Sequence, residues 1–169
     1  GSNNTAVGAA ALFSNTTGTP NDAFGYQALY NNTTGASNTG IGSYSLLANT
    51  IGTQNVAVGS QSLYSNTTGS NNTAVGFGAG YLITTGSNNV ALGWGALSNQ
   101  INTGNSNTAA GYRSMYNNTS ASSNSAFGYY SLYNNSTGSP NDAFGYQALF
   151  SNTTGNANVA VGWQSLYAN

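Results

Sequence analysis

The sequence predicts an all-β chain that forms a β-solenoid, a parallel β-roll of ten 17-residue coils with two short strands in each coil. Three observations support this prediction. One glycine recurs every 17 residues, the residues around it repeat in fixed columns, and the repeat is too short for helix pairs, which need about 33 residues or more. The coils form a single array over residues 2–18, 19–35, 36–52, 53–69, 70–86, 87–104, 105–121, 122–138, 139–155 and 156–169.

The period is set by the glycine that ends each Asn-x-Ala-Val-Gly motif, which we call the marker glycine. Positions are counted from it, so position −4 lies four residues before the marker glycine and position +4 four residues after it. The step is 17 residues except for one of 18, between Gly93 and Gly111, where the extra residue lies in SNQINTG at 98–104. Paired coils stack about 4.8 Å apart, so ten of them predict a rod of roughly 50 Å. The marker glycines, which allow close approach of a neighbouring backbone, are Gly8, Gly25, Gly42, Gly59, Gly76, Gly93, Gly111, Gly128, Gly145 and Gly162.

Position −4 is asparagine in every coil. A side-chain amide both donates and accepts hydrogen bonds, so stacked asparagines can satisfy one another along the rod. The sequence therefore predicts an amide ladder of the kind found in stacked β structures. Its members are Asn4, Asn21, Asn38, Asn55, Asn72, Asn89, Asn107, Asn124, Asn141 and Asn158.

The remaining columns predict the elements of a coil in order. The segment N-T-A-V-G alternates as a strand does, and N-T-T-G has turn chemistry. We expect the Val, Ile and Phe residues at position −1 and the Leu residues at position +4 to fill the interior. The stretch G-Y-Q-A-L-Y predicts a second strand, because a helix needs roughly 8–10 Å of lateral room and coils are only about 4.8 Å apart.

Composition excludes several functions. The chain has one basic residue, two acidic ones, no His and no Cys. General acid–base catalysis and transition-metal sites need such residues, so we expect no enzyme, no metal and no cofactor. A net charge of −1 gives no basic field for nucleic acid. No apolar run approaches the ~20 residues of a membrane span, and the chain opens on Gly-Ser-Asn-Asn rather than on a signal peptide.

Disorder is the alternative interpretation of a chain rich in Asn, Thr, Ser and Gly. The aromatic content of 12% and the fixed columns argue against it. Such a coil encloses little apolar volume, and small cores are only marginally stable. Solenoids also need polar caps, and neither end has one. We therefore expect several chains to pack side by side, or rods to stack end to end in a longer fibre.

The motifs NVAVGSQSL at 55–63 and NVALGWGAL at 89–97 resemble the head repeats of trimeric autotransporter adhesins, the YadA-like left-handed β-roll. The match covers the Asn, the Ala-Val-Gly core and the Ala or Ser at position +3 in essentially every coil, although this repeat is longer than the family's usual one. Similar Asn/Thr-rich arrays occur in phage tail fibres and bacterial surface proteins. The resemblance implies a left-handed roll and a parallel homotrimer displayed on a cell surface or a virion.

Aromatic residues are the first candidate contacts. An exposed stripe at position +1 could stack on sugars, as Tyr and Trp join an apolar face to a polar group. The alternative is packing between coils or chains. Positions +1 and +5 should form one broad stripe. The candidate glycan-stacking residues are Tyr26, Trp94, Tyr112, Tyr129, Tyr146 and Trp163.

Three further features suggest weaker candidates. Asn-x-Ser/Thr sequons in or beside the closing turns could carry glycans, although a repeat of this composition makes sequons by chance. Asp22 and Asp142 could hold a cation, but each stands alone in its coil, whereas calcium needs several oxygens. The Thr-Thr pairs suggest ice binding as a further function, because threonine ladders on a flat β-solenoid can order water. These pairs, however, lie in turns rather than in a flat central strand. The candidate N-glycosylation sites are Asn15, Asn32, Asn66, Asn118, Asn135 and Asn152.

These features predict a structural segment of an extracellular fibre, either an adhesin head or shaft or part of a tail fibre. It would be a stiff, self-associating rod. The alternative function is a carbohydrate-binding module that uses the aromatic stripe on host-surface glycans, and ice binding ranks lower.

Overall fold

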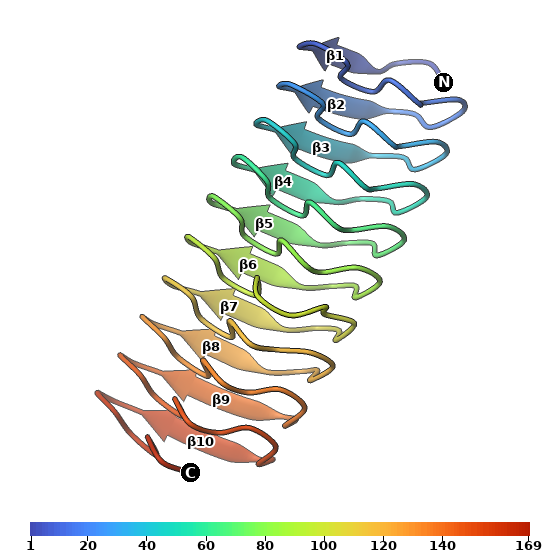
Figure 1. Cartoon of the computed structure of the whole chain (residues 1–169). Coiled ribbons are helices and arrows are strands. Elements are labelled where there is room, and N and C mark those ends of the chain that lie inside the picture. The colour runs from blue at the N-terminus through green and yellow to red at the C-terminus, as the bar shows by residue number, and fades with distance from the viewer.

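The computed structural model describes all of residues 1–169 as one stack of coils with no helix (Figure 1). Each coil contributes one short strand, and the ten strands form a single parallel sheet in chain order. The strands are β1 (Thr5–Val7), β2 (Asn21–Phe24), β3 (Asn38–Ile41), β4 (Val56–Val58), β5 (Thr73–Val75), β6 (Val90–Leu92), β7 (Thr108–Ala110), β8 (Ser125–Phe127), β9 (Asn141–Phe144) and β10 (Asn158–Val161). The predicted β-solenoid is therefore confirmed.

The strand register follows the sequence columns. Ala57 lies opposite Ala74 in the next coil, and Asn21 lies opposite Asn38, each 17 residues further along the chain. The step of 18 residues keeps the same pairing, because Ala91 still lies opposite Ala109. The extra residue is taken up by a loop in which Ile101 is exposed. An insertion on this side of the coil thus leaves the sheet intact.

The core is a thin line of apolar side chains along the axis. Leu at position +4 supplies its largest members, and alanines at positions −2 and +3 fill the space around them. In the middle of the rod these side chains are 0–2% exposed. Burial of a Leu side chain contributes about 1.5–3 kcal/mol, so the leucine column is the main apolar contribution in most coils.

The residue at position −1 points outward, so the prediction that this column fills the interior is wrong. In β2, Asn21 and Ala23 are buried while Asp22 and Phe24 are exposed. Side chains alternate between the two faces of a strand. Because Asn and Ala occupy the inner face, the apolar residue after Ala must lie on the outer one. The exposed members of this outer apolar column are Val7, Phe24, Ile41, Val75, Leu92, Phe127, Phe144 and Val161.

The predicted second strand is also absent, because the backbone from the marker glycine onward turns repeatedly. Gln27 and Leu29 have φ of 54° and 53°, and the same two positions have positive φ in the other coils. A strand needs φ near −120°. The N–H of Ala28 bonds back to the carbonyl of Gly25, closing a turn, while the N–H of Leu29 bonds to Ser45 in the next coil.

Backbone bonding between coils therefore extends beyond the sheet. Of 108 backbone hydrogen bonds, only 22 lie within the strands. The turn segments form hydrogen bonds with both neighbouring coils. The N–H of Gln27 donates to the carbonyl of Ala9 in the preceding coil, and the N–H of Asn31 donates to the carbonyl of Leu47 in the following coil. The whole circumference of a coil holds it to its neighbours, although only three or four residues per coil are strand.

The predicted amide ladder is present, and its central members are buried. Oδ1 of Asn38 accepts the backbone N–H of Asn55 at 3.0 Å and its Nδ2 at 3.1 Å. Nδ2 of Asn38 donates to the carbonyl of Gly52, which closes the coil, at 2.8 Å. A buried polar group without such partners costs roughly 1–3 kcal/mol. The ladder thus makes a polar interior compatible with a small core.

A second amide ladder lies at position +7. Nδ2 of Asn49 donates to Oδ1 of Asn32 in the preceding coil at 2.8 Å, and to the carbonyl of Gly52 at 3.1 Å. Nδ2 of Asn66 continues the ladder to Oδ1 of Asn49. The sequence signal for it was the Asn that recurs one residue before the Thr-Thr pair. Most coils are therefore held by two internal amide columns in addition to the leucine column; the fifth and sixth coils, with Ile83 and Gln100 at position +7, interrupt the second ladder.

Candidate functional site

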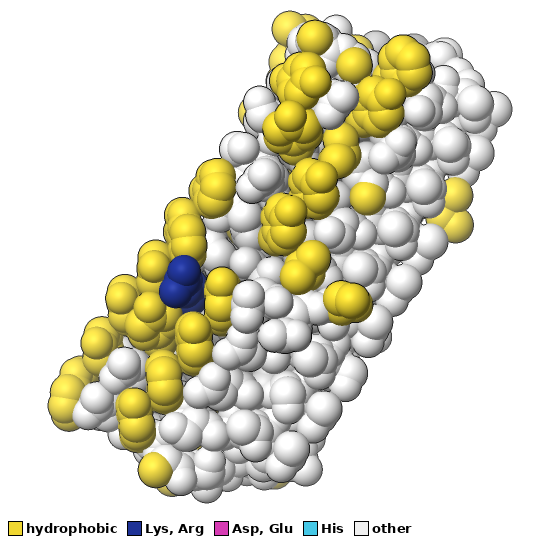
Figure 2. Space-filling view, viewed as in Figure 1, with side chains coloured by type: hydrophobic (Ala, Val, Ile, Leu, Met, Phe, Trp, Pro, Cys, Tyr) yellow, Lys and Arg dark blue, Asp and Glu magenta, His cyan; other side chains and the backbone are white.

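Apart from Phe24, Phe127 and Phe144 of the outer apolar column, the aromatic side chains gather on one face of the rod, where positions +1, +2 and +5 meet. Tyr130, at position +2, has its ring 4.3 Å from that of Tyr129 at position +1 and 4.8 Å from that of Tyr133 at position +5. We call positions +1, +2 and +5 together the aromatic face. Figure 2 shows hydrophobic side chains along one edge of the rod, with the chain's one basic side chain among them.

The rings at position +1 stack on one another. Trp94 and Tyr112 are 5.1 Å apart between centroids, Tyr112 and Tyr129 are 5.0 Å apart, and Tyr129 and Tyr146 are 5.3 Å apart, all within 13° of parallel. Phe77 and Trp163 extend the stack at its two ends. Five of the six candidate stacking residues thus cover one another's faces, which is packing between coils. Sugars stack on free ring faces, and this column leaves mainly edges exposed.

Tyr26 does not join that column. Ser43 and Ser60 occupy position +1 in the next two coils, and the ring of Tyr26 meets Tyr44 edge-on at 5.2 Å. Position +5 forms its own stacks, such as Tyr133 on Phe150 at 5.1 Å. Aromatic pairs of this kind contribute about 0.5–1.5 kcal/mol beyond their buried area. The aromatic face therefore stabilises the rod.

Arg113 lies on the aromatic face among three rings. Its guanidinium carbon is 4.7 Å from the ring centre of Trp94, 4.8 Å from Tyr116 and 5.4 Å from Tyr112. Loss of solvent lowers the pKa of Arg113, but the interaction with Tyr116 and other tyrosines outweighs this and raises it overall. Burial raises the pKa of Tyr133, and Arg113 opposes that rise. The guanidinium is therefore held by cation–π contacts, which the sequence did not reveal.

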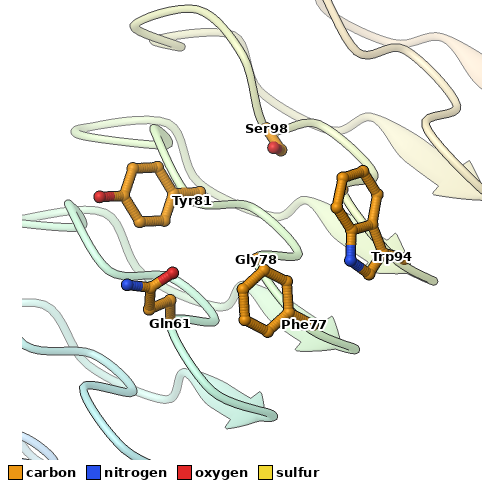
Figure 3. Close-up of a pocket in the computed structure, with 7 residues that line it drawn as sticks. Gln61, Phe77, Gly78, Tyr81, Trp94 and Ser98 are labelled. Carbon is orange, nitrogen blue, oxygen red and sulfur yellow. The ribbon is translucent and has the colours of Figure 1, made fainter.

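A cleft of about 170 Å³ opens on this face, midway along the rod (Figure 3). Phe77 and Trp94 line one side, and Tyr81 lies across from them. Its other lining residues are Gln61, Gly78, Gly95 and Ser98. The cleft exists because the two glycines stand at position +2, where most other coils carry Gln, Tyr or Arg. Sequence reasoning missed it, although the paired glycines and Ser98 were visible signals.

The candidate glycosylation sites lie inside the solenoid, so the expectation that they are on the surface is wrong. Asn32, Asn66, Asn118, Asn135 and Asn152 are at most 1% exposed, and Asn15 is half-buried. These residues are the second amide ladder. Nδ2, the atom that would carry a glycan, donates in Asn32 to Gly35 at 2.9 Å and to Asn15 at 3.0 Å. A glycan on this nitrogen is incompatible with the folded coil.

The two acidic residues are not brought together. Asp22 lies on the outer face of β2 beside Thr5 and Thr39, and Asp142 lies on β9 beside Ser125 and Val159. No three His, Cys, Asp or Glu residues cluster in a way that could hold a metal ion.

The closing turns hold their threonines in two different environments. The first hydroxyl of a Thr-Thr pair bonds within the rod, as Thr33 does to the carbonyl of Thr50 at 3.0 Å. The first hydroxyl therefore already has a partner within the rod, whereas the second threonine, as at Thr34, is exposed. Ice binding stays a prediction. The chain also contains no helix with the length and hydropathy of a membrane span.

No protein-family model, curated protein or solved structure matches this chain. The resemblance to adhesin head repeats therefore stays a prediction from the repeat motifs, and the geometry described above is the basis for the functional conclusions.

Proposed function

We propose that this chain is a structural segment of an extracellular fibre, as in an adhesin head or shaft or a tail fibre, and that it associates laterally with copies of itself. The observation that carries the proposal is the outer apolar column. Its Phe24, Phe127 and Phe144 are 39–41% exposed, and it runs from β1 to β10 along the rod. Contiguous exposed apolar surface of this kind is typical of protein–protein contacts.

The geometry of the column suits a neighbour of the same kind. Its members repeat once per coil and follow the axis, so a second rod with the same spacing meets it over the full length. Phe127 and Phe144 already stack at 5.2 Å, which presents a flat apolar strip. Because the chain carries only three charged side chains, close approach of two copies costs little electrostatic repulsion. Three parallel rods around one axis, as the resemblance implies, would bury this strip.

The fold supports a mechanical role in the fibre. Backbone bonds around the whole coil and the first amide ladder join each coil to the next, and the second ladder and the stacked rings add to them along most of the rod. These repeated contacts favour a stiff rod that projects a surface away from a cell or virion, where many weak contacts can act together. End-to-end stacking of rods would lengthen such a fibre, and it remains a prediction.

Multi-angle light scattering of the purified chain tests the proposal. We expect a mass that is a multiple of the 17.1 kDa chain, with three copies as the first expectation. Replacing Phe24, Phe127 and Phe144 by Thr should give monomers, since Thr keeps strand propensity but removes the apolar strip. The control variant changes Thr34, Thr68 and Thr137, which are exposed in the closing turns, to Ser. A monodisperse monomer of the unmodified chain at high concentration would refute lateral association.

Carbohydrate binding is the second candidate function, and the cleft is the observation that favours it. The stacked rings leave no free faces along most of the position +1 column, so a general sugar-binding stripe has little support. The cleft differs, because there the columns are interrupted.

A further inference from the structure

The cleft lies at a gap in the aromatic face. At position +5, Tyr81 stacks on Tyr64 at 4.8 Å, but the next coil has Ser98 there, and Tyr116 follows only one coil later. At position +1, Phe77 has Trp94 on one side and follows Ser60 of the preceding coil. Tyr81 and Phe77 therefore each have an aromatic neighbour on one side only, and both line the cleft.

We propose that this cleft binds one neutral hexopyranose ring of a glycan. The ring would take the place of the aromatic side chain that Ser98 omits. The inference goes beyond the structural role proposed above and does not depend on self-association. It limits carbohydrate recognition to a single subsite formed by the fourth, fifth and sixth coils.

The lining residues fit the two surfaces of a pyranose. A sugar ring has an apolar face of C–H groups, which packs against an aromatic face, here the face of Tyr81 that is turned toward the sixth coil and that Ser98 leaves uncovered. Phe77 lines the cleft beside it, with its own face toward the sixth coil covered by Trp94. Its hydroxyl groups need neutral donors and acceptors at the edge, and the amide of Gln61 and the hydroxyl of Ser98 provide both. No charged side chain lines the cleft itself, and the guanidinium of nearby Arg113 is already engaged by the rings of Trp94, Tyr112 and Tyr116, so we take a neutral sugar as the ligand.

The size of the cleft selects a single ring. Sites for drug-sized ligands enclose about 300–1,000 Å³, whereas this cleft measures about 170 Å³. Gly78 supplies the floor: its φ is 62°, and a Cβ added to it would have no atom within 4 Å. Gln27 and Gln61 occupy the same position with φ of 54° and 60°. A longer side chain at Gly78 is therefore compatible with the backbone and would fill the cleft.

The two tryptophans allow a direct test by nuclear magnetic resonance. Trp94 lines the cleft, and Trp163 lies on the last coil, so the ¹⁵N-labelled chain gives one indole signal from the site and one internal control. The probes are the methyl glycosides of glucose, galactose, mannose and N-acetylglucosamine, titrated to high millimolar concentration. We expect saturable shifts of the Trp94 indole signal with at least one probe and an unchanged Trp163 signal. Methyl glucuronide should have a weaker effect than methyl glucoside.

Two variants and a matched control complete the experiment. Gly78→Gln fills the cleft with the side chain that other coils carry, and Ser98→Tyr supplies the missing ring; both should abolish the Trp94 shift. Ala10→Gln makes a similar change at position +2 of the first coil, where φ is 59°, and should leave binding unchanged. No shift with any probe, a shift confined to Trp163, or undiminished binding by a folded Gly78→Gln or Ser98→Tyr variant would each overturn the proposal. None of these results bears on lateral association, which light scattering tests separately.

Discussion

At the scale of single residues, the fifth coil shows how one exception compensates for another. It has Gly80 where the other coils have Leu or Met, and Ile83 where most have the Asn of the second ladder. A Cβ on Gly80 would lie 3.1 Å from the Cδ1 of Ile83, so the isoleucine reaches into the space that the leucine leaves. Loss of the asparagine at position 83 has a cost in the preceding coil, where the buried Oδ1 of Asn66 has no hydrogen-bond partner.

The two exceptions should therefore be strongly coupled energetically. Ile83→Asn alone removes the large apolar side chain of its coil and should cost about 2–4 kcal/mol. Gly80→Leu alone overpacks the same space and should cost about 1–3 kcal/mol. The backbone at position 80 is suited to leucine, because φ is 63° at Gly80 and 47–53° at the equivalent leucines.

The double variant rebuilds the standard coil, in which Asn at 83 can donate to Asn66. We expect its free energy of unfolding, measured by equilibrium denaturation in urea, to lie within about 1 kcal/mol of the parent chain. Destabilisation equal to the sum of the two single variants would show that the residues do not compensate for each other.

At the scale of the element, the corner after each strand depends on the marker glycine. Gly59 has φ of 133°, and an added Cβ would lie 2.5 Å from the carbonyl oxygen of Gly76. Only glycine adopts this φ readily, and the neighbouring coil leaves no room for a methyl group. Gly78 stands two residues after the next corner with φ of 62° and open space around it.

Alanine at these two glycines should therefore have opposite effects. Gly59→Ala should destabilise the rod by at least about 2 kcal/mol, since it combines backbone strain with a clash. Gly78→Ala should be neutral or stabilise by about 0.4–1 kcal/mol, because it restricts the unfolded chain. Thermal unfolding followed by circular dichroism measures both, and equal melting temperatures would contradict the assigned role of the corner.

At the scale of the whole molecule, the array should behave as a sum of coils and interfaces. Deleting residues 53–69 removes one complete coil and joins Gly52 to Ser70 with every column in phase. We expect a folded chain with a slightly lower melting temperature, because one interface is lost. Deleting residues 53–61 removes fewer residues but puts the columns out of phase.

The out-of-phase variant should lose cooperative unfolding, which scanning calorimetry detects. If both deletions unfolded alike, the fold would not depend on column register. A one-residue insertion is tolerated in the loop around Ile101, but only because the strands on both sides keep their pairing.

The sequence predicted the period, the parallel stack and the first amide ladder, because these follow from columns that hardly vary. It did not reveal which apolar column faces inward, since Ala at position −2 and Val or Phe at position −1 are both apolar. Variability was the missed signal: Phe144 and Ala110 share a column, and a tight core does not accept both sizes. Similarly, the constancy of Asn32 and its equivalents indicated burial rather than glycosylation.

The second strand was predicted wrongly because leucines in the left-handed region look like ordinary strand residues in a sequence. Leu29 and Leu63 hold φ of 53° and 47°, a conformation that costs an isolated residue roughly 1–2 kcal/mol. Bonds to the neighbouring coils compensate for it, and those bonds exist only once the stack has formed. The cleft depends on the same stack, as its walls come from successive coils.

The direction of the hydrogen bonds between coils has a consequence for force. Most of them join one coil to the next along the rod, so a pull on the two ends opens them one coil at a time rather than shearing many at once. Each opened coil releases 17 residues, which extend to roughly 50 Å beyond their stacked height. Under tension the rod would lengthen in equal steps, and each step would dissipate energy. When the force falls, the coils would refold onto the stack one after another.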